Sequence, residues 1–347
     1  MKRVVSVMLL GMVLETMGFA QSDLQPAVIV RLTKSEPITV KQYRTEVERM
    51  EKQAGRPLDA TERRQVLDVM INEKLAIQAA ERDKVIVSDN EINQQIQKLR
   101  SGMMQQAGRQ PTDAEFAIAV RNETGLELPA FREQLRRQLI TQKYLLSKKQ
   151  NLFNSITPPT ETDILNTYTL AKTQFIRPET VRFSMIQVPF GTDTGAKAKA
   201  KELADRLIWE IGSNPAKFDE AVIRGQTPNS GYQAGDGGYL PRNLEAQQVV
   251  GKDFIDTAFS LKQGEVSKLI EGLRAYQIIK VTETYEQKSL ELNDVFQLGT
   301  RMTVRDYIGN ALLQERQQTV LERATQELVT ELRSGNPFQI FESNLKW

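Results

Sequence analysis

The residues that could do chemistry in this chain are limited by its composition, because none of its 347 residues is a cysteine or a histidine. This excludes thiol nucleophiles, Ser-His-Asp triads, disulfides and zinc sites with nitrogen or sulfur ligands. A Gly-Asp-Gly-Gly run at residues 235–238 holds the carboxylate of Asp236 among residues that allow close backbone approach. The run could take a direct part in binding a substrate or form a tight turn that the fold needs, and we favour the turn.

The elements that must position this run are predicted between residues 179 and 287. Residues 181–188 and 275–284 have the composition of strands. Between them, residues 196–211 have a helical apolar period and end before a glycine, and Asn214 followed by proline starts another helix. Strands that bracket helices and a glycine-rich loop indicate a compact α+β module, of a kind that could hold an extended peptide.

The chain on either side of this module is predicted to be helical. Capping-box starts, in which Ser, Thr or Asp precedes Glu or Gln by three residues, occur at Thr39, Asp59, Ser88 and Thr112. Apolar residues then recur every three or four positions, which is the period of amphipathic helices packed on one another. The predicted fold class is α+β, with a mainly helical domain and an inserted α+β domain.

Two short strands are predicted outside the module, at residues 27–32 and 338–341. An isolated strand is not stable, and the simplest partner for each is the other. This pairing predicts a discontinuous domain, in which residues 288–347, as C-terminal helices and a strand, complete the helical domain of residues 21–155. Residues 156–178 are predicted to form a linker helix that leads into the module.

Residues 1–20 have the pattern of a cleavable signal peptide. Lys2 and Arg3 precede an apolar run at residues 4–14, and a small-x-small cleavage site ends at Ala20. The apolar run is too short to span a bilayer. An uncleaved membrane anchor is the alternative interpretation, but we expect the mature protein to be exported and soluble, without stable membrane insertion.

The module resembles a parvulin-type peptidyl-prolyl isomerase domain over residues 179–284. The resemblance rests on motifs in the order of that family: Ser-Met-Ile at 184–186, the glycine run before Tyr239, Phe254 to Phe259, Gly-Glu-Val-Ser at 264–267 and Tyr-Gln-Ile-Ile-Lys-Val at 276–281. It implies an apolar pocket for a proline ring, formed by Leu240, Val250 and Phe254.

The sequence departs from this family at the polar positions of its site. The two histidine positions fall on Met185 and Gln277, and the loop position that usually holds Cys or Asp falls near Thr227 and Pro228. Gln277 can still donate and accept hydrogen bonds, whereas a thioether offers little. We therefore expect both residues to contribute to substrate binding, with isomerase activity weak or absent and with no cofactor or metal.

The flanking helical segments resemble the chaperone domain of SurA-like periplasmic folding factors at residues 38–43, 64–82 and 87–92. The favoured hypothesis is an ATP-independent periplasmic holdase that binds unfolded outer-membrane or secreted proteins and uses the module for peptide binding. An active isomerase is the alternative, and a static adaptor is a third. A net charge of +2 gives no argument for nucleic acid, and no phosphate-binding loop of the Gly-x-x-x-x-Gly-Lys-Ser/Thr type is present, which argues against a nucleotide.

Overall fold

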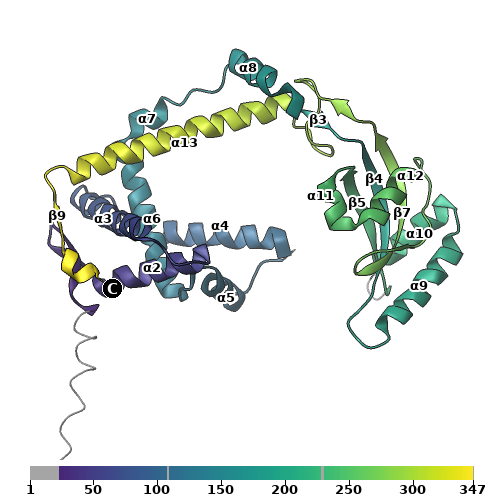
Figure 1. Ribbon diagram of the computed structural model, residues 1–347, viewed down its shortest axis with the longest axis horizontal. Coiled ribbons are helices and arrows are strands. Elements are labelled where there is room, and N and C mark those ends of the chain that lie inside the picture. Colours follow the sequence, from purple (N-terminus) through teal and green to yellow (C-terminus); the bar gives the residue numbers. More distant parts are fainter. Residues whose placement is uncertain (1–22, 108, 228–229, 347) are drawn as a thin grey trace, which may run out of the picture. The chain divides into compact units, whose positions relative to one another are not determined.

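The structure is a computed structural model that describes residues 23–107, 109–227 and 230–346 (Figure 1). It divides into two compact units. The helical unit contains the described residues up to Ile156 and from Glu315 onward, and the α+β unit is Thr157–Gln314. The predicted signal peptide, residues 1–20, lies outside the described residues. No described helix combines the length and the apolar character that crossing a membrane requires.

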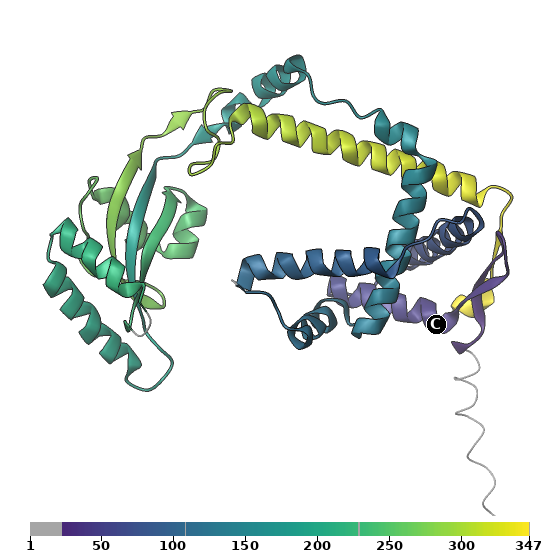
Figure 2. The ribbon, with the colours of Figure 1, turned by 180° about the vertical axis from the view of Figure 1, so that it is seen from behind.

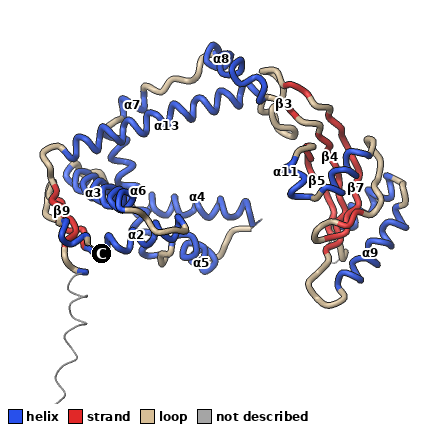
Figure 3. Tube along the Cα trace, viewed as in Figure 1, coloured by secondary structure: helices blue, strands red, loops and turns tan. Residues whose placement is uncertain are grey.

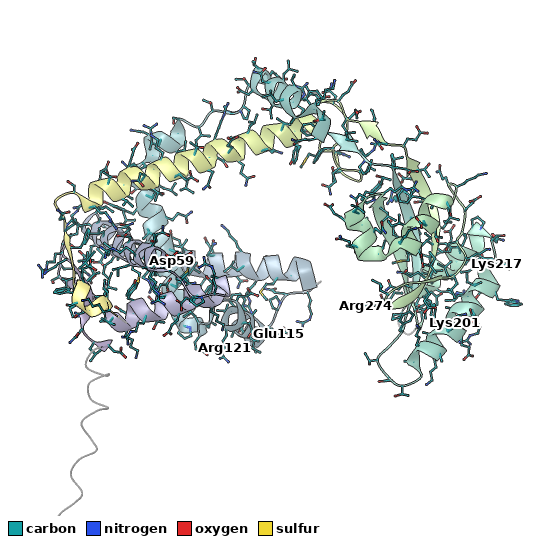
Figure 4. The ribbon with its side chains drawn as sticks, in the orientation of Figure 1. Asp59, Glu115, Arg121, Lys201, Lys217 and Arg274 are labelled. Atoms are coloured by element: carbon teal, nitrogen blue, oxygen red, sulfur yellow. The ribbon has the colours of Figure 1, made fainter. Side chains whose placement is uncertain are left out.

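The helical unit contains α2 (Val40–Ala54), α3 (Ala60–Arg82), α4 (Asp89–Ala107), α5 (Asp113–Thr124), α6 (Leu128–Lys148), α7 (Gln150–Asn154) and the C-terminal part of α13 (Val304–Arg333). The first four of these helices begin where the capping signals predict. The reciprocal hydrogen bonds of the capping box form at all four predicted starts: Thr39, Asp59, Ser88 and Thr112. Figure 4 labels Asp59, together with Glu115, the partner of Thr112.

A small sheet joins the two ends of the described chain. Its order is β2-β1-β9, with β1 at Pro26–Val30, β2 at Glu36–Thr39 and β9 at Phe338–Ile340. Val28 pairs with Ile340 in the antiparallel β1–β9 ladder, which confirms the predicted pairing of the two outlying strands. Strand β2, which was not predicted from the sequence, pairs with the other edge of β1.

Helix α13 also joins the C-terminal segment to the N-terminal helices. The C-terminal helices predicted in residues 288–347 form one continuous helix, α13, seen in Figure 2. Its residues Ala324, Leu328 and Leu332 are buried in the same core as α2, α3, α6 and β1. Arg333 ends the helix with an ion pair to Asp68 of α3, 2.7 Å between Nη2 and Oδ1. The helical unit is therefore discontinuous in sequence, but residues 288–314, which were predicted to belong to it, lie in the α+β unit.

The α+β unit is organised around a sheet with the order β5-β4-β7-β6. These strands are β4 (Thr180–Pro189), β5 (Gln233–Pro241), β6 (Ile270–Glu271) and β7 (Ala275–Tyr285). Helices α9 (Ala196–Ile211) and α10 (Pro215–Gly225) pack on one face through a core with Ile186 and Ile278. Helices α11 (Leu244–Val250) and α12 (Lys252–Ser260) cover the other face (Figure 3).

The glycine-rich run is part of a strand, so the predicted loop and tight turn are wrong. Residues 235–238 lie in β5, where Asp236 pairs with Ser184 and Gly238 pairs with Phe183 of β4. Gly237 is the extra residue of a β-bulge between these pairs. A Cβ atom on Gly237 would lie 2.3 Å from Cε2 of Phe183, so this glycine is needed for a close approach between strand and ring.

A separate small core lies where the chain enters and leaves the sheet of the α+β unit. Here β3 (Ile176–Arg177) pairs with β8 (Lys288–Ser289), and α8 (Glu161–Ala171) packs against the start of α13. The buried hydroxyl of Tyr168 in α8 donates a hydrogen bond to the carbonyl oxygen of Leu290, at 3.0 Å. The segments before and after the sheet are thereby held together.

Candidate functional site

The structure brings the two substituted polar positions together on the face of the sheet that α11 and α12 cover. Met185 of β4 packs against the apolar core of that face. Gln277 of β7 donates from Nε2 to Sδ of Met185 at 3.7 Å. A neutral thioether is a weak acceptor, so this contact orients the amide without polarising it. The pair presents no cation, no strong acid and no base.

Gln277 retains unused hydrogen-bonding capacity. Its Oε1 is buried and has no hydrogen-bond partner among the described residues. The oxygen faces Gly272 in the turn between β6 and β7, where a Cβ would lie 2.6 Å from it. The turn continues through the exposed Leu273 and Arg274, the latter labelled in Figure 4. A small residue at 272 thus leaves room for the Gln277 side chain at the edge of the face.

The three apolar residues expected to form a proline pocket belong to the same core as Met185. Phe254 and Leu240 are only 2% and 5% exposed, and the ring of Phe254 meets that of Phe183 edge-on with centroids 5.4 Å apart. Val250 is partly buried at the end of α11. The bottom of the expected proline pocket is therefore filled mainly by core side chains. The side chains that remain accessible to a peptide are those of Met185, Val250 and Gln277.

Asp236 is held by a structural ion-pair network. Arg182 donates to Oδ2 of Asp236 at 2.7 Å and to Oε1 of Glu283 at 2.9 Å, and its guanidinium lies over the ring of Tyr239. The hydrogen bond from Arg182, aided by the Gly238 N–H, lowers the pKa of Asp236. The hydrogen bond to Glu283 raises the pKa of Tyr285 to about 12. Asp236 thus stays ionised and paired, which favours a role in the fold.

Thr227 is the described residue at the loop position that the family resemblance placed near Thr227 and Pro228. Thr227 donates from Oγ1 to the carbonyl oxygen of Arg224 at 2.6 Å, just after the end of α10. Pro228 lies outside the described residues.

Two further polar residues on this face were missed by the sequence analysis. Gln187 of β4 lies directly opposite Gln277 of β7 and also opposite Gln233 of β5. Strand alternation could have found Gln187, because residues two apart in a strand share a face and Gln187 follows Met185 by two. Gln233 could not be found in this way, since its segment was predicted as a loop.

Comparisons with known proteins agree with this architecture. Residues 4–145 match the model of a SurA-like N-terminal domain, and residues 168–285 match that of a PPIC-type PPIase domain. A relative named foldase protein PrsA, from Clostridium botulinum (strain Loch Maree), is 24% identical over 305 residues, 88% of this chain and 80% of that protein.

A chaperone SurA from Alcanivorax borkumensis is 30% identical over 231 residues, which are 65% of this chain and 49% of the relative. A solved structure described among SurA-like chaperones of Campylobacter jejuni covers 91% of this chain and 100% of its own, with 15% identity. Its TM-score is 0.39.

Proposed function

We propose that this chain, which combines a SurA-like N-terminal domain with a PPIC-type peptidyl-prolyl isomerase domain, is an ATP-independent chaperone that holds extended polypeptide segments. Its isomerase domain contributes binding more than catalysis. The observation that carries this proposal is the neutral contact between Met185 and Gln277 at the polar centre of the face.

The chemistry of isomerisation explains why this contact argues against a fast enzyme. Rotation about an X-Pro bond has a barrier of about 18–20 kcal/mol. Oriented polar groups lower such barriers, and each is worth on the order of 10²–10³ in rate. Met185 cannot donate a hydrogen bond, and Gln277 carries no charge. The apolar surroundings remain able to bind a proline ring or another apolar side chain.

The names of the relatives support the broader assignment, since one is called a foldase and the other a chaperone. We propose export to the periplasm through the signal-like residues 1–20, and clients among outer-membrane or secreted proteins. We also propose residues 179–287 as the peptide-binding domain, residues 156–178 as its linker, and residues 21–155 with the C-terminal segment from Glu315 onward as the chaperone domain. Site roles for Leu240, Val250 and Phe254 belong to this proposal.

A pair of assays on the purified full-length protein tests the proposal. We expect it to suppress aggregation of an unfolded β-barrel client without ATP, while a proline-peptide assay shows little or no rate enhancement. Isomerisation as fast as that of ordinary parvulins, abolished in Gln277→Ala, would instead establish an active foldase.

An active foldase is the second candidate because the buried, unpartnered Oε1 of Gln277 could accept a hydrogen bond from a substrate amide. A static adaptor, the third candidate, would fail to suppress aggregation and would retain one stoichiometric partner in a pull-down.

A further inference from the structure

Three glutamines form a row across the sheet of the α+β unit. Gln187 in β4 pairs with Gln233 in β5 and with Gln277 in β7. Residues directly opposite in antiparallel strands point to the same face, with Cβ atoms about 4.5–5.5 Å apart. The contact between Gln277 and Met185 places this glutamine row on the face that α11 and α12 cover, beside the candidate site.

The hydrogen-bonding capacity of the row is largely unused. Each primary amide offers two N–H donors and one carbonyl acceptor. Among the described residues, the weak bond to Met185 is the one side-chain hydrogen bond found for the row, and Oε1 of Gln277 is buried without a partner. Oε1 is buried against Gly272, so a ligand N–H reaches it when the Gln277 side chain turns toward the open face. The bond then recovers the free energy that an acceptor without a partner costs.

The next position along the sheet is open. Gly235 pairs with Met185, and a Cβ on Gly235 would meet no heavy atom within 4 Å. The absence of a side chain there leaves space between Met185 and the edge of β5. A line of neutral amides therefore adjoins a small, open, apolar area.

We propose that the glutamine row binds the main-chain amides of an extended, uncharged polypeptide segment, one of whose apolar side chains lies over Met185 and Gly235. A primary amide pairs with main-chain N–H and C=O groups whatever the side chains are, so recognition is independent of sequence. Because the row carries no charge, binding is expected to change little with ionic strength. The inference rests on the proposed chaperone function and names the chemistry that its isomerase domain recognises.

A fluorescent reporter beside the row tests this. The chain has no cysteine, so Leu273→Cys can be labelled uniquely with an environment-sensitive dye. Leu273 is 75% exposed and follows Gly272, which faces Gln277. The probe is an end-capped, uncharged ten-residue peptide with one proline, used beside the same peptide N-methylated at alternate main-chain nitrogens.

In this labelled background the double variant Gln187→Leu with Gln233→Leu is compared with Gln263→Leu, an equal chemical change at an exposed loop position. We expect the double variant to bind the unmodified peptide on the order of tenfold more weakly, through the loss of about two net hydrogen bonds. The loss should be much smaller for the methylated peptide, and Gln263→Leu should bind as the parent does.

If the double variant and the parent bind the peptide equally well, the glutamine row does not bind main-chain amides. The chaperone proposal would remain intact. Failure of the parent to bind either peptide, together with failure to suppress aggregation, would overturn both. Thermal unfolding checks that the variants fold. If the leucine double variant does not fold, the double variant Gln187→Thr with Gln233→Thr replaces it. Threonine side chains are too short to reach a ligand, so this variant must show the same selective loss of affinity for the unmodified peptide.

Discussion

At the scale of single residues, two glycines of β5 should respond oppositely to the same substitution. A Cβ on Gly237 would overlap the ring of Phe183, whereas one on Gly235 would meet nothing within 4 Å. Gly237→Ala is expected to lower the free energy of unfolding by about 1–3 kcal/mol, since overpacking forces the ring or strand to move. Gly235→Ala should leave the free energy of unfolding nearly unchanged. Denaturant unfolding measures both, and equal effects would contradict the assigned bulge.

The roles of these residues could be predicted only in part from sequence. Met185 and Gln277 were identified by motif, and the structure brings them together because their strands are neighbours. The role of Gly237 depends on Phe183, more than fifty residues earlier, and on the β-bulge between them. The local glycine content favours a turn. The run forms a strand because it pairs with β4, which the local sequence does not reveal.

At the scale of elements, helix starts were predictable because a capping box is contained within four residues. The strands β2 and β5 were not, since their assignment depends on pairing with β1 and β4. Residues Gln233 to Gly238 of β5 include none of the β-branched residues that mark a strand in sequence. Helix starts fixed by local hydrogen bonds were therefore identified correctly, and the two strands without a local strand signal, β2 and β5, were missed.

The capping carboxylates also predict how the stability of the helical unit changes with pH. Hydrogen bonds from Arg56, Lys143 and Arg109 are the main causes that lower the pKa values of Glu62, Glu91 and Glu115 to about 2. Their folded-state pKa values lie below the ordinary value, so their stabilisation is present above about pH 4.5 and is lost as pH falls toward 2.

Urea midpoints measured between pH 7 and pH 2 check this dependence. The wild-type midpoint should fall below about pH 4.5, and it should fall less steeply in Glu115→Gln, which cannot titrate. Glu48→Gln, at an exposed position of α2, serves as the control and should keep the wild-type slope. An unchanged slope in Glu115→Gln would contradict a stabilising role for that carboxylate.

At the scale of the whole molecule, the stability of the N-terminal helices should depend on the C-terminal strand β9. Ile340 pairs with Val28, Asn344 Nδ2 donates to the carbonyl oxygen of Pro26 at 3.0 Å, and Glu342 forms an ion pair with Arg64 of α3. Deletion of residues 338–347 exposes the edge of β1 and removes apolar cover from its core. We expect faster hydrogen exchange throughout residues 23–156.

The same experiment can separate the strand pairing from a general effect of truncation. Ile340→Lys buries a charge against the core of the helical unit and should reproduce much of the faster exchange, whereas Gln339→Lys, exposed in the same strand, should not. The exchange of β4 and β7 should stay unchanged in all three variants, because no β9 residue belongs to the cores on either face of their sheet. Unchanged exchange in residues 23–156 after the deletion would show that β9 is dispensable, and the discontinuous domain would then depend on α13 alone.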